Sequence, residues 1–420
     1  MDKSQTQATD FLKSLGSVDE VLAEAGNTGL PDSLTYNSHI HLPPNFSAFE
    51  TVQQAVQTAA DEGVQVLGCG NYYDYSVYQC FTETAQDKGV FPLFGTEIIA
   101  LETDLQEQGI RINDPGNPGK YYICGKGISR FEQLSPRADE LLSGIRNNDT
   151  LRMREMTEKM AAVFSEQGID TGLDDKAVID RVVKRHGCSA DMVTLQERHL
   201  TQAFQEVFFE KVPSDQRIAK LTELFGTEPK SGPEDAVGIQ NEIRTYLMKA
   251  GKVCFVPETF VNLAQAKELI LELGGIPCYP VLADGSSQRC EYEMPLEKLI
   301  ETLKANDYAM VELIPIRNSA ESLTEYVTAI RQAGIAVVAG TEHNTLDLLP
   351  IQPTCVGGAA IPEGIDAIFK EGICVLAAHA FLKAQGQDGF VDAAEEDANE
   401  RIERFGRIGA VVLKRYFEKQ

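Results

Sequence analysis

The 420-residue sequence lacks any apolar run approaching the roughly 18 residues that a membrane-spanning helix requires. It also lacks an excess of basic residues. It has 38 Lys and Arg and 63 Asp and Glu, which gives a formal net charge of −25. Since nucleic-acid binding depends mainly on Lys and Arg contacts to phosphates, this balance argues against a nucleic-acid partner. The first 30 residues contain no apolar core of a secretory signal. We therefore expect a cytoplasmic protein that binds neither membranes nor nucleic acid.

Three common catalytic signatures are missing as well. The sequence has no G-x-S-x-G of serine hydrolases, no G-x-x-x-x-G-K-[ST] of nucleotide hydrolases and no G-x-G-x-x-G after a predicted strand. Its nine cysteines include no C-x-x-C pair, and their scattered positions fit reduced, mostly buried thiols. These absences direct attention to the six histidines.

Two of the histidines form the motif His39-Ile40-His41 at the end of a short extended run. Alternate side chains of a strand point to the same face, so we expect both imidazoles on one side. Neutral imidazole is the commonest metal ligand in proteins, and two rings on one face can share an ion. The alternative interpretation is a solvated pair in a loop.

Apolar patterns predict strands that alternate with helices at both ends of the chain. The strand candidates lie at 34–41, 64–69, 90–99, 120–127, 253–256, 275–281, 308–315, 335–340 and 373–378. This number favours an α/β fold, a distorted TIM-like barrel of seven or eight β/α units, over an open sheet. We expect three parts: an N-terminal helix within 1–30, a barrel formed by 31–128 and 250–420, and a helical insertion or cap at 129–249.

Polar residues follow several of these strands, where the active groups of β/α barrels lie. Glu97 ends an apolar strand, and Gly340-Thr341-Glu342-His343-Asn344 follows a later one. Carboxylates at the ends of buried strands need a partner that neutralises their charge, such as a metal ion or an arginine. Glu342 and His343 can alternatively cap the next helix, and His379 can be either a site residue or a core histidine.

Arg198 and His199 lie in the first turns of a helix predicted within the insertion. From there they can reach the mouth of the barrel or remain on the helix surface. Arg317 follows another predicted strand, and Tyr279 lies near the end of one. These residues are candidates for binding and orienting an anionic substrate.

Taken together, the motifs resemble the PHP family, the metal-dependent phosphoesterase domain named for polymerases and histidinol phosphatase, and more closely a divergent bacterial branch of it. The likeness is carried by His39-Ile40-His41, Gly95-Thr96-Glu97, the segments 252–257, 274–280 and 311–313, and Gly340-Thr341-Glu342-His343-Asn344. The resemblance implies a distorted barrel that holds divalent Zn, Mn or Fe ions, which activate water for attack on a phosphate ester.

The sequence departs from this family pattern at several expected ligands. Asn71-Tyr72 stands in place of Asp-His, Tyr121 or Tyr122 in place of a His, Cys278-Tyr279-Pro280 in place of Ala-His-Pro, and Glu342-His343-Asn344 in place of Asp-x-His. Amide and phenol groups bind such metals less well than carboxylate and imidazole. We therefore expect one or two ions rather than a full set of three.

The leading hypothesis is a metal-dependent phosphoesterase that acts on a small, anionic phosphorylated metabolite. Its predicted metal ligands are His39, His41, Glu97 and Glu342, with His343, His199 and His379 as further candidates. Its predicted catalytic and substrate-orienting residues are Glu97, His343, Arg317, Arg198 and Tyr279. The alternatives are a metal-dependent isomerase or lyase of sugar acids, and a degenerate barrel that binds a metabolite without catalysis. An oligomer is compatible with the sequence.

Overall fold

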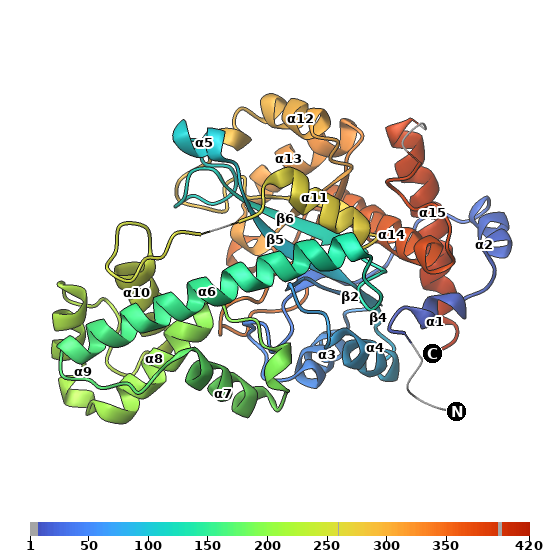
Figure 1. The fold of residues 1–420 in the computed structure, drawn as a ribbon. Helices are drawn as coiled ribbons and strands as arrows, with labels where there is room; N and C mark the ends of the chain where they lie inside the picture. The colour runs from blue at the N-terminus through green and yellow to red at the C-terminus, as the bar shows by residue number, and fades with distance from the viewer. Residues whose placement is uncertain (1–6, 259, 394–396) are drawn as a thin grey trace.

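The computed structural model describes residues 7–258, 260–393 and 397–420 (Figure 1). Its first sheet is parallel, with the order β1 (Tyr36–Ile40), β2 (Val66–Cys69) and β4 (Phe91–Leu93). The second sheet has the order β3 (Asn71–Tyr72), β5 (Gly95–Leu101), β6 (Lys120–Lys126), β7 (Ile276–Val281), β8 (Met310–Leu313) and β9 (Ala336–Ala339). β6 is antiparallel to β5 and β7, and the other neighbours are parallel. The predicted α/β class is confirmed: the first sheet is parallel, and the second is parallel except at β6.

The two sheets meet at two places. β2 leads directly through Gly70 into β3, so one chain segment serves both sheets. On the other side, β1 is hydrogen-bonded to the segment after β9: the His41 N–H donates to the Glu342 carbonyl, and the Glu342 N–H donates to the His39 carbonyl, each at 2.8 Å. The ends of β1, β3 and β9 are therefore held close together.

Helices surround the strands. Before β6 the chain forms α1 (Asp10–Lys13), α2 (Val18–Ala25), α3 (Val52–Asp61), α4 (Tyr78–Asp87) and α5 (Thr103–Glu107). Between β6 and β7 it forms α6 (Pro136–Glu166), α7 (Asp175–His186), α8 (Glu197–Lys211), α9 (Ser214–Phe225), α10 (Ala236–Ile243) and α11 (Leu263–Glu272). The last helices are α12 (Leu296–Ala305), α13 (Ala320–Gln332), α14 (Glu363–Ala384) and α15 (Ala398–Phe417). No helix in these described ranges is long and apolar enough to cross a membrane.

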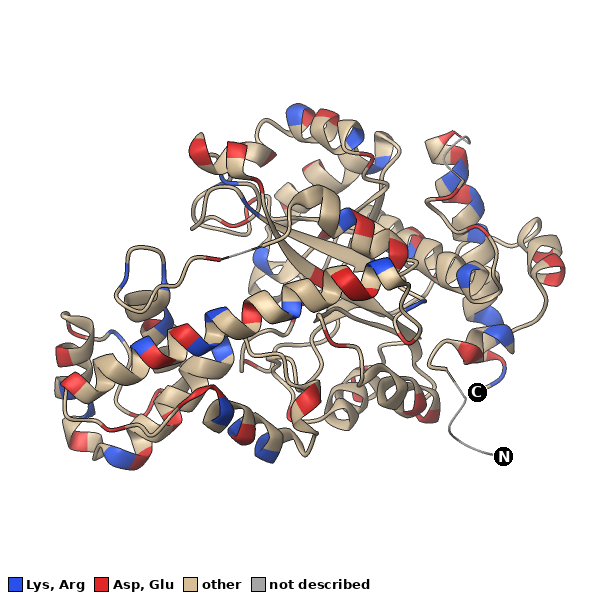
Figure 2. Ribbon diagram, viewed as in Figure 1, with Lys and Arg blue, Asp and Glu red and all other residues tan. Residues whose placement is uncertain are grey.

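The long helix α6 connects two hydrophobic clusters. It begins where the Ser135 side chain accepts a hydrogen bond from the Ala138 N–H, with proline at its first position. Near this end Leu142 packs in the main core around the sheets, whereas Met160 and Phe164 pack in a second cluster with α8 and α10. Figure 1 shows α6 running from the sheets to the group α7–α10. Figure 2 shows Lys and Arg interspersed with Asp and Glu along these helices, as expected of solvated outer faces.

Two predicted strands are wrong, and a third is divided. Residues 373–378 lie inside α14, and residues 253–256 lie outside the strands. The predicted strand 90–99 is split at Phe94 into β4 of the first sheet and β5 of the second. A short apolar run is compatible with a buried strand and with a buried helix, and α14 is buried on nearly every side over this stretch. The N-terminal segment also forms two short helices, α1 and α2, in place of one.

The contact between α14 and α15 depends on a glycine. A Cβ placed on Gly409 would lie 1.7 Å from the carbonyl oxygen of Cys374 in α14. No side chain fits at that distance. The two helix backbones can therefore approach this closely only because residue 409 has no side chain.

Gly409→Ala should therefore lower the free energy of unfolding by about 1–3 kcal/mol, the usual cost of overpacking. Gly144→Ala is the matched control, because Gly144 lies in α6 and a Cβ added there would have no neighbouring atom within 4 Å. Alanine should stabilise that helix by about 0.5–1 kcal/mol. Urea denaturation of both variants tests the expectation, and equal stabilities would contradict it.

Candidate functional site

Three side chains converge where the sheets meet. His39 lies in β1, His41 follows that strand, and Glu97 lies in β5. The two imidazole rings are 5.1 Å apart, and the Glu97 Oε2 lies 3.2 Å from the His41 Nε2 and 3.6 Å from the His39 Nε2. One ligand atom from each residue lies within 4.8 Å of the others, so the group can surround a single ion.

The atoms at the centre of this group have no hydrogen-bond partner among the described residues. They are the His39 Nε2, both ring nitrogens of His41 and the Glu97 Oε2, and all three side chains are buried. The 3.2 Å contact between His41 and Glu97 does not have hydrogen-bond geometry. Buried polar atoms are nearly always satisfied, so unpartnered nitrogen and oxygen atoms that face one another fit a cation.

Neighbouring residues hold the three side chains in place. The Tyr72 hydroxyl donates to the Glu97 Oε1 at 2.6 Å, and its ring stacks on His41 at 5.2 Å between centroids. Gly70 leaves the space that His39 occupies, because a Cβ there would lie 2.4 Å from the His39 Nε2. Tyr72 fixes one oxygen of Glu97 and leaves the other directed at the histidines.

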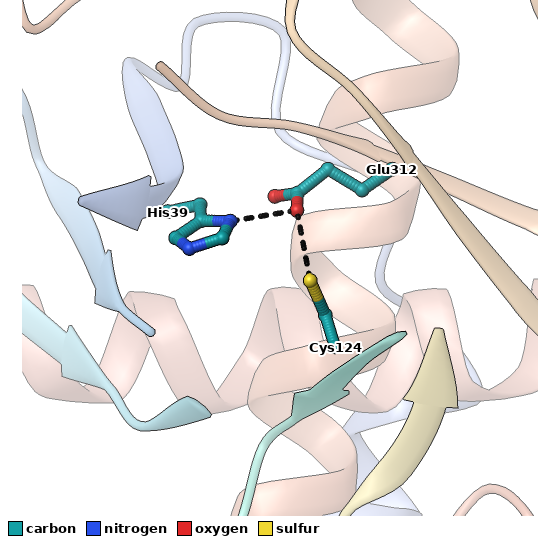
Figure 3. A group of neighbouring side chains, drawn as sticks. All are labelled: His39, Cys124 and Glu312. Carbon is teal, nitrogen blue, oxygen red and sulfur yellow. Dashed lines mark hydrogen bonds and ion pairs between the residues drawn. The ribbon is translucent and has the colours of Figure 1, made fainter. Parts of the chain in front are cut away.

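Behind His39 lies Glu312, at the heart of a second group that includes Cys124 (Figure 3). The Glu312 Oε2 lies 2.8 Å from the His39 Nδ1 and accepts a hydrogen bond from the Cys124 thiol at 3.7 Å. A carboxylate at Nδ1 places the ring proton there and leaves the lone pair on Nε2. Glu312 therefore gives His39 the tautomer and the orientation that a metal ligand needs.

Lys126, at the end of β6, neutralises Glu312. Its ammonium lies 2.6 Å from the Glu312 Oε1, and both side chains are buried. Burial alone would lower the pKa of Lys126, but the Glu312 carboxylate holds it above its usual range. Burial would raise the pKa of Glu312, but Lys126 and then His39 hold it well below. Both groups are charged at neutral pH.

The site opens into a cavity of about 380 Å³ whose walls come from the sheets and from the helices after β6. At the end formed by the sheets lie His39, Glu97 and Glu342. The Glu342 Oε2 accepts hydrogen bonds from Arg317 at 2.5 Å and Asn344 at 2.8 Å. Glu342 has a φ of 63°, an uncommon conformation for a non-glycine residue, which turns the chain at the end of β9. Burial would raise the pKa of Glu342, but Arg317 holds it low.

The helical wall of the cavity is strongly charged. Glu197, the first residue of α8, accepts hydrogen bonds from Arg152 at 2.5 Å and from Arg244 at 2.7 Å. Burial would raise the pKa of Glu197, but Arg244 and Arg152 keep it far below its usual range. Arg198 also lines the cavity, and burial followed by the nearby Arg244 lowers its pKa to about 10.

The structure does not bring three of the predicted ligands to the His39, His41 and Glu97 group. His199 accepts from the Gln196 N–H and contacts the Pro44 carbonyl, His343 lies between Thr341 and the Leu349 carbonyl, and His379 lies between the Phe390 N–H and the Gly274 carbonyl. Both ring nitrogens of each are thus in hydrogen bonds. Burial lowers the pKa of His199 to about 3 and that of His379 to about 4, as befits neutral core histidines.

Tyr279 also has a different environment from the one expected. Its hydroxyl contacts the Ile112 carbonyl at 3.2 Å and the Glu293 carboxylate at 3.0 Å, within a buried aromatic group that includes Tyr121 and Tyr308. It is not among the described residues that line the cavity. Tyr72 and Tyr122 line the cavity instead.

Several residues around the site gave little signal in the sequence. Glu312 lies in the segment 311–313 that carries the family resemblance but was not among the predicted ligands, and Lys126 did not stand out at all. The sequence nonetheless contains a signal for Lys126. A lysine at the end of an otherwise apolar buried strand requires a nearby carboxylate. Arg244 and Lys249 also line the cavity and carried no comparable signal, because each is one basic residue among many in a polar helical region.

Lys126→Met should lower the free energy of unfolding by about 3–5 kcal/mol, because it leaves the Glu312 carboxylate buried without its main counter-charge. The double variant Lys126→Met/Glu312→Gln should recover part of this loss, since a neutral amide costs less to bury. Chemical denaturation of wild type, Lys126→Met, Glu312→Gln and the double variant measures the coupling. A single variant as stable as wild type would contradict the role given to this pair.

No protein-family model and no curated protein matches this sequence. Among solved structures, one assigned as a metal-dependent phosphoesterase from Bifidobacterium adolescentis is similar to this chain with a TM-score of 0.52 and 15% identity, over 80% of this chain and 96% of the other. An amidohydrolase from Chromobacterium violaceum, solved with bound sulfate and no metal, gives a TM-score of 0.50 and 16% identity over the same shares. At these identities the likeness establishes a shared α/β fold of the kind found in these hydrolases.

Proposed function

We propose that the protein is a metal-dependent phosphoesterase that hydrolyses a small phosphorylated metabolite. The observation that carries the proposal is the convergence of the His39 Nε2, the His41 Nε2 and the Glu97 Oε2, buried and unpartnered among the described residues. Two of these side chains line a cavity that also contains basic residues. A cation beside an anion-binding wall suits a phosphate ester.

Two imidazoles and a carboxylate form a donor set that suits Zn, Mn or Fe. We assign His39, His41 and Glu97 as ligands. We keep Glu342 as a further carboxylate, because it lines the same cavity, where Arg317 and Asn344 bind its Oε2. When bound, such an ion lowers the pKa of a water molecule and polarises a phosphoryl oxygen. We propose one ion, because the ammonium of Lys126 already supplies the positive charge at the second group, His39, Cys124 and Glu312.

The remaining residues of the site orient these ligands and the substrate. Glu312 orients His39, and Tyr72 orients Glu97. Arg317 is bound to Glu342 and so positions that carboxylate. The side chain of Arg198 forms no ion pair with any described residue. It makes a 3.4 Å hydrogen bond to the Asn241 side chain and lies 5.8 Å from the centre of the Phe46 ring. We therefore assign Arg198 as the residue that binds the phosphate group.

We further propose that 31–128 and 250–420 form a distorted barrel of the PHP type, that 129–249 forms a cap over its mouth, and that 1–30 packs outside it. The bonds between β1 and the segment after β9 support the barrel, since they join the first strand to the last. The cap is supported by the cavity, which α6, α8 and the turn around Arg244 help to line. The neighbour with bound sulfate supports an oxyanion ligand for this fold.

Removal of His41 tests the metal directly. His41→Ala should reduce bound metal from stoichiometric to trace amounts, and the fold should persist because neither ring nitrogen has a hydrogen-bond partner among the described residues. His186→Ala is the control, since His186 lies half-buried at the end of α7, against the Glu50 carbonyl and outside the proposed ligand group. Elemental analysis of protein purified without chelator measures both, and full metal content in His41→Ala would refute the assignment.

Metal-loaded protein should release phosphate from small phosphomonoesters, and a chelator should abolish the release. Arg198→Met should lower kcat/KM about 10–100-fold, because a charge-assisted contact to phosphate is lost. Lys252→Met, which removes an exposed lysine, is the control. Turnover of sugar acids without phosphate release would favour the isomerase or lyase, and ligand-induced thermal stabilisation without any turnover would favour a binding protein.

A further inference from the structure

Most cations that line the cavity already have a carboxylate partner. Arg152 contacts Glu197, Arg317 contacts Glu342, and Lys120 contacts Glu258 at 2.8 Å. The side chain of Lys249 differs, because it forms no hydrogen bond or ion pair with any residue that the structure describes. An ammonium that lines a cavity without a counter-ion is available to an anionic ligand.

Lys249 and Arg198 have different surroundings in the cavity. Arg198 interacts electrostatically with Arg244 and, beyond it, with Tyr72 and Glu342, which adjoin the proposed metal ligands. Lys249 interacts with Arg244 and Glu197 of the helical wall and with Lys120 of β6. Both cations thus interact with Arg244, and Arg198 also interacts with Glu342 beside the proposed metal ligands.

Arg244 adds a second donor beside Lys249. The guanidinium binds Glu197 through Nε, and neither Nη1 nor Nη2 has a hydrogen bond to a described residue. Arg244 opens the π-helical turn Arg244–Met248, and Lys249 follows this turn directly. Such turns are rare and recur at functional sites, because they shift side chains out of the regular helical register. This turn directs two neighbouring cations at one cavity.

The proximity of these cations is unfavourable without a ligand. Burial lowers the pKa of Lys249, and the guanidinium of Arg244 lowers it further. Asp114, Asp149, Glu197 and Glu258 also line the cavity, but none of them is within ion-pair distance of Lys249 in the described structure. An oxyanion between Lys249 and Arg244 would relieve this repulsion and use the free Nη donors.

We propose that Lys249 and Arg244 form an oxyanion-binding subsite on the helical wall of the cavity, separate from the metal centre. The substrate would then carry two anionic groups, a phosphate ester at the metal and a second oxyanion, such as a phosphate or carboxylate, at the subsite. The subsite itself needs no metal, whereas its consequence for substrate choice rests on the proposed phosphoesterase function.

Titration of inorganic phosphate into chelator-treated, full-length protein tests the subsite by calorimetry. Wild type should bind phosphate, and Lys249→Met should weaken binding about tenfold through loss of a charge-assisted contact. Lys249→Arg should retain binding within about threefold, which separates a charge effect from a folding defect. The surface control Lys252→Met should change affinity less than about twofold, since Lys252 is exposed and is not among the described residues that line the cavity. Arg198→Met is measured beside it, because it shows how much of the binding depends on the other cavity cation that has no carboxylate partner.

Three results would overturn the subsite: no phosphate binding by wild type, unchanged binding by Lys249→Met with an unaltered melting temperature, or loss of binding only in Arg198→Met. His41→Ala should bind phosphate as wild type does, because the titration involves neither metal nor turnover. The protein can therefore fail to bind phosphate while it binds metal, or bind phosphate without binding metal. The two proposals are thus tested separately.

Discussion

The buried contact between Lys126 and Glu312 is the interaction on which the rest of the site depends. Glu312 can orient His39 only as a carboxylate, and a carboxylate with no exposed surface requires a positive charge beside it. Lys126 supplies that charge from the neighbouring part of the second sheet. His39 in turn lies in the first sheet and is bonded through its backbone to the segment that carries Glu342. One ion pair thus fixes the geometry between elements from both sheets.

Around this centre, two parts of the chain contribute different kinds of side chain to the cavity. The sheets contribute rigid, buried ligands with their supporting hydrogen bonds, as befits a metal centre. The helices after β6 contribute most of the arginines and lysines, with Glu197 holding Arg152 and Arg244 in place. Under the proposed function, chemistry and substrate selection would be carried by different elements, so that the helical wall could vary without disturbing the ligands.

Local patterns were sufficient to predict the central group and insufficient to predict its surroundings. His39, His41 and Glu97 were found because strand alternation and strand ends are visible over a few residues. The predictions for His199, His343 and His379 depended on what lies around each ring, and in every instance a backbone group reached through folding satisfies it. Lys126 was missed for the same reason, since its partner Glu312 lies 186 residues away. The α14 segment shows a different limit, because its apolar run has no period that separates helix from strand.

The continuity of α6 has a consequence for the size and shape of the cavity. Its first turns are anchored in the core around the sheets, and its later turns carry Asp149, Arg152 and Met153 to the cavity. Along one unbroken helix each added residue turns everything after it by about 100° and advances it by about 1.5 Å. A single insertion after Ile145 would therefore swing Arg152 away from Glu197 and turn the second hydrophobic cluster out of register. The number of residues in α6 before Arg152 therefore determines which of its side chains face the cavity, in addition to how much space they leave.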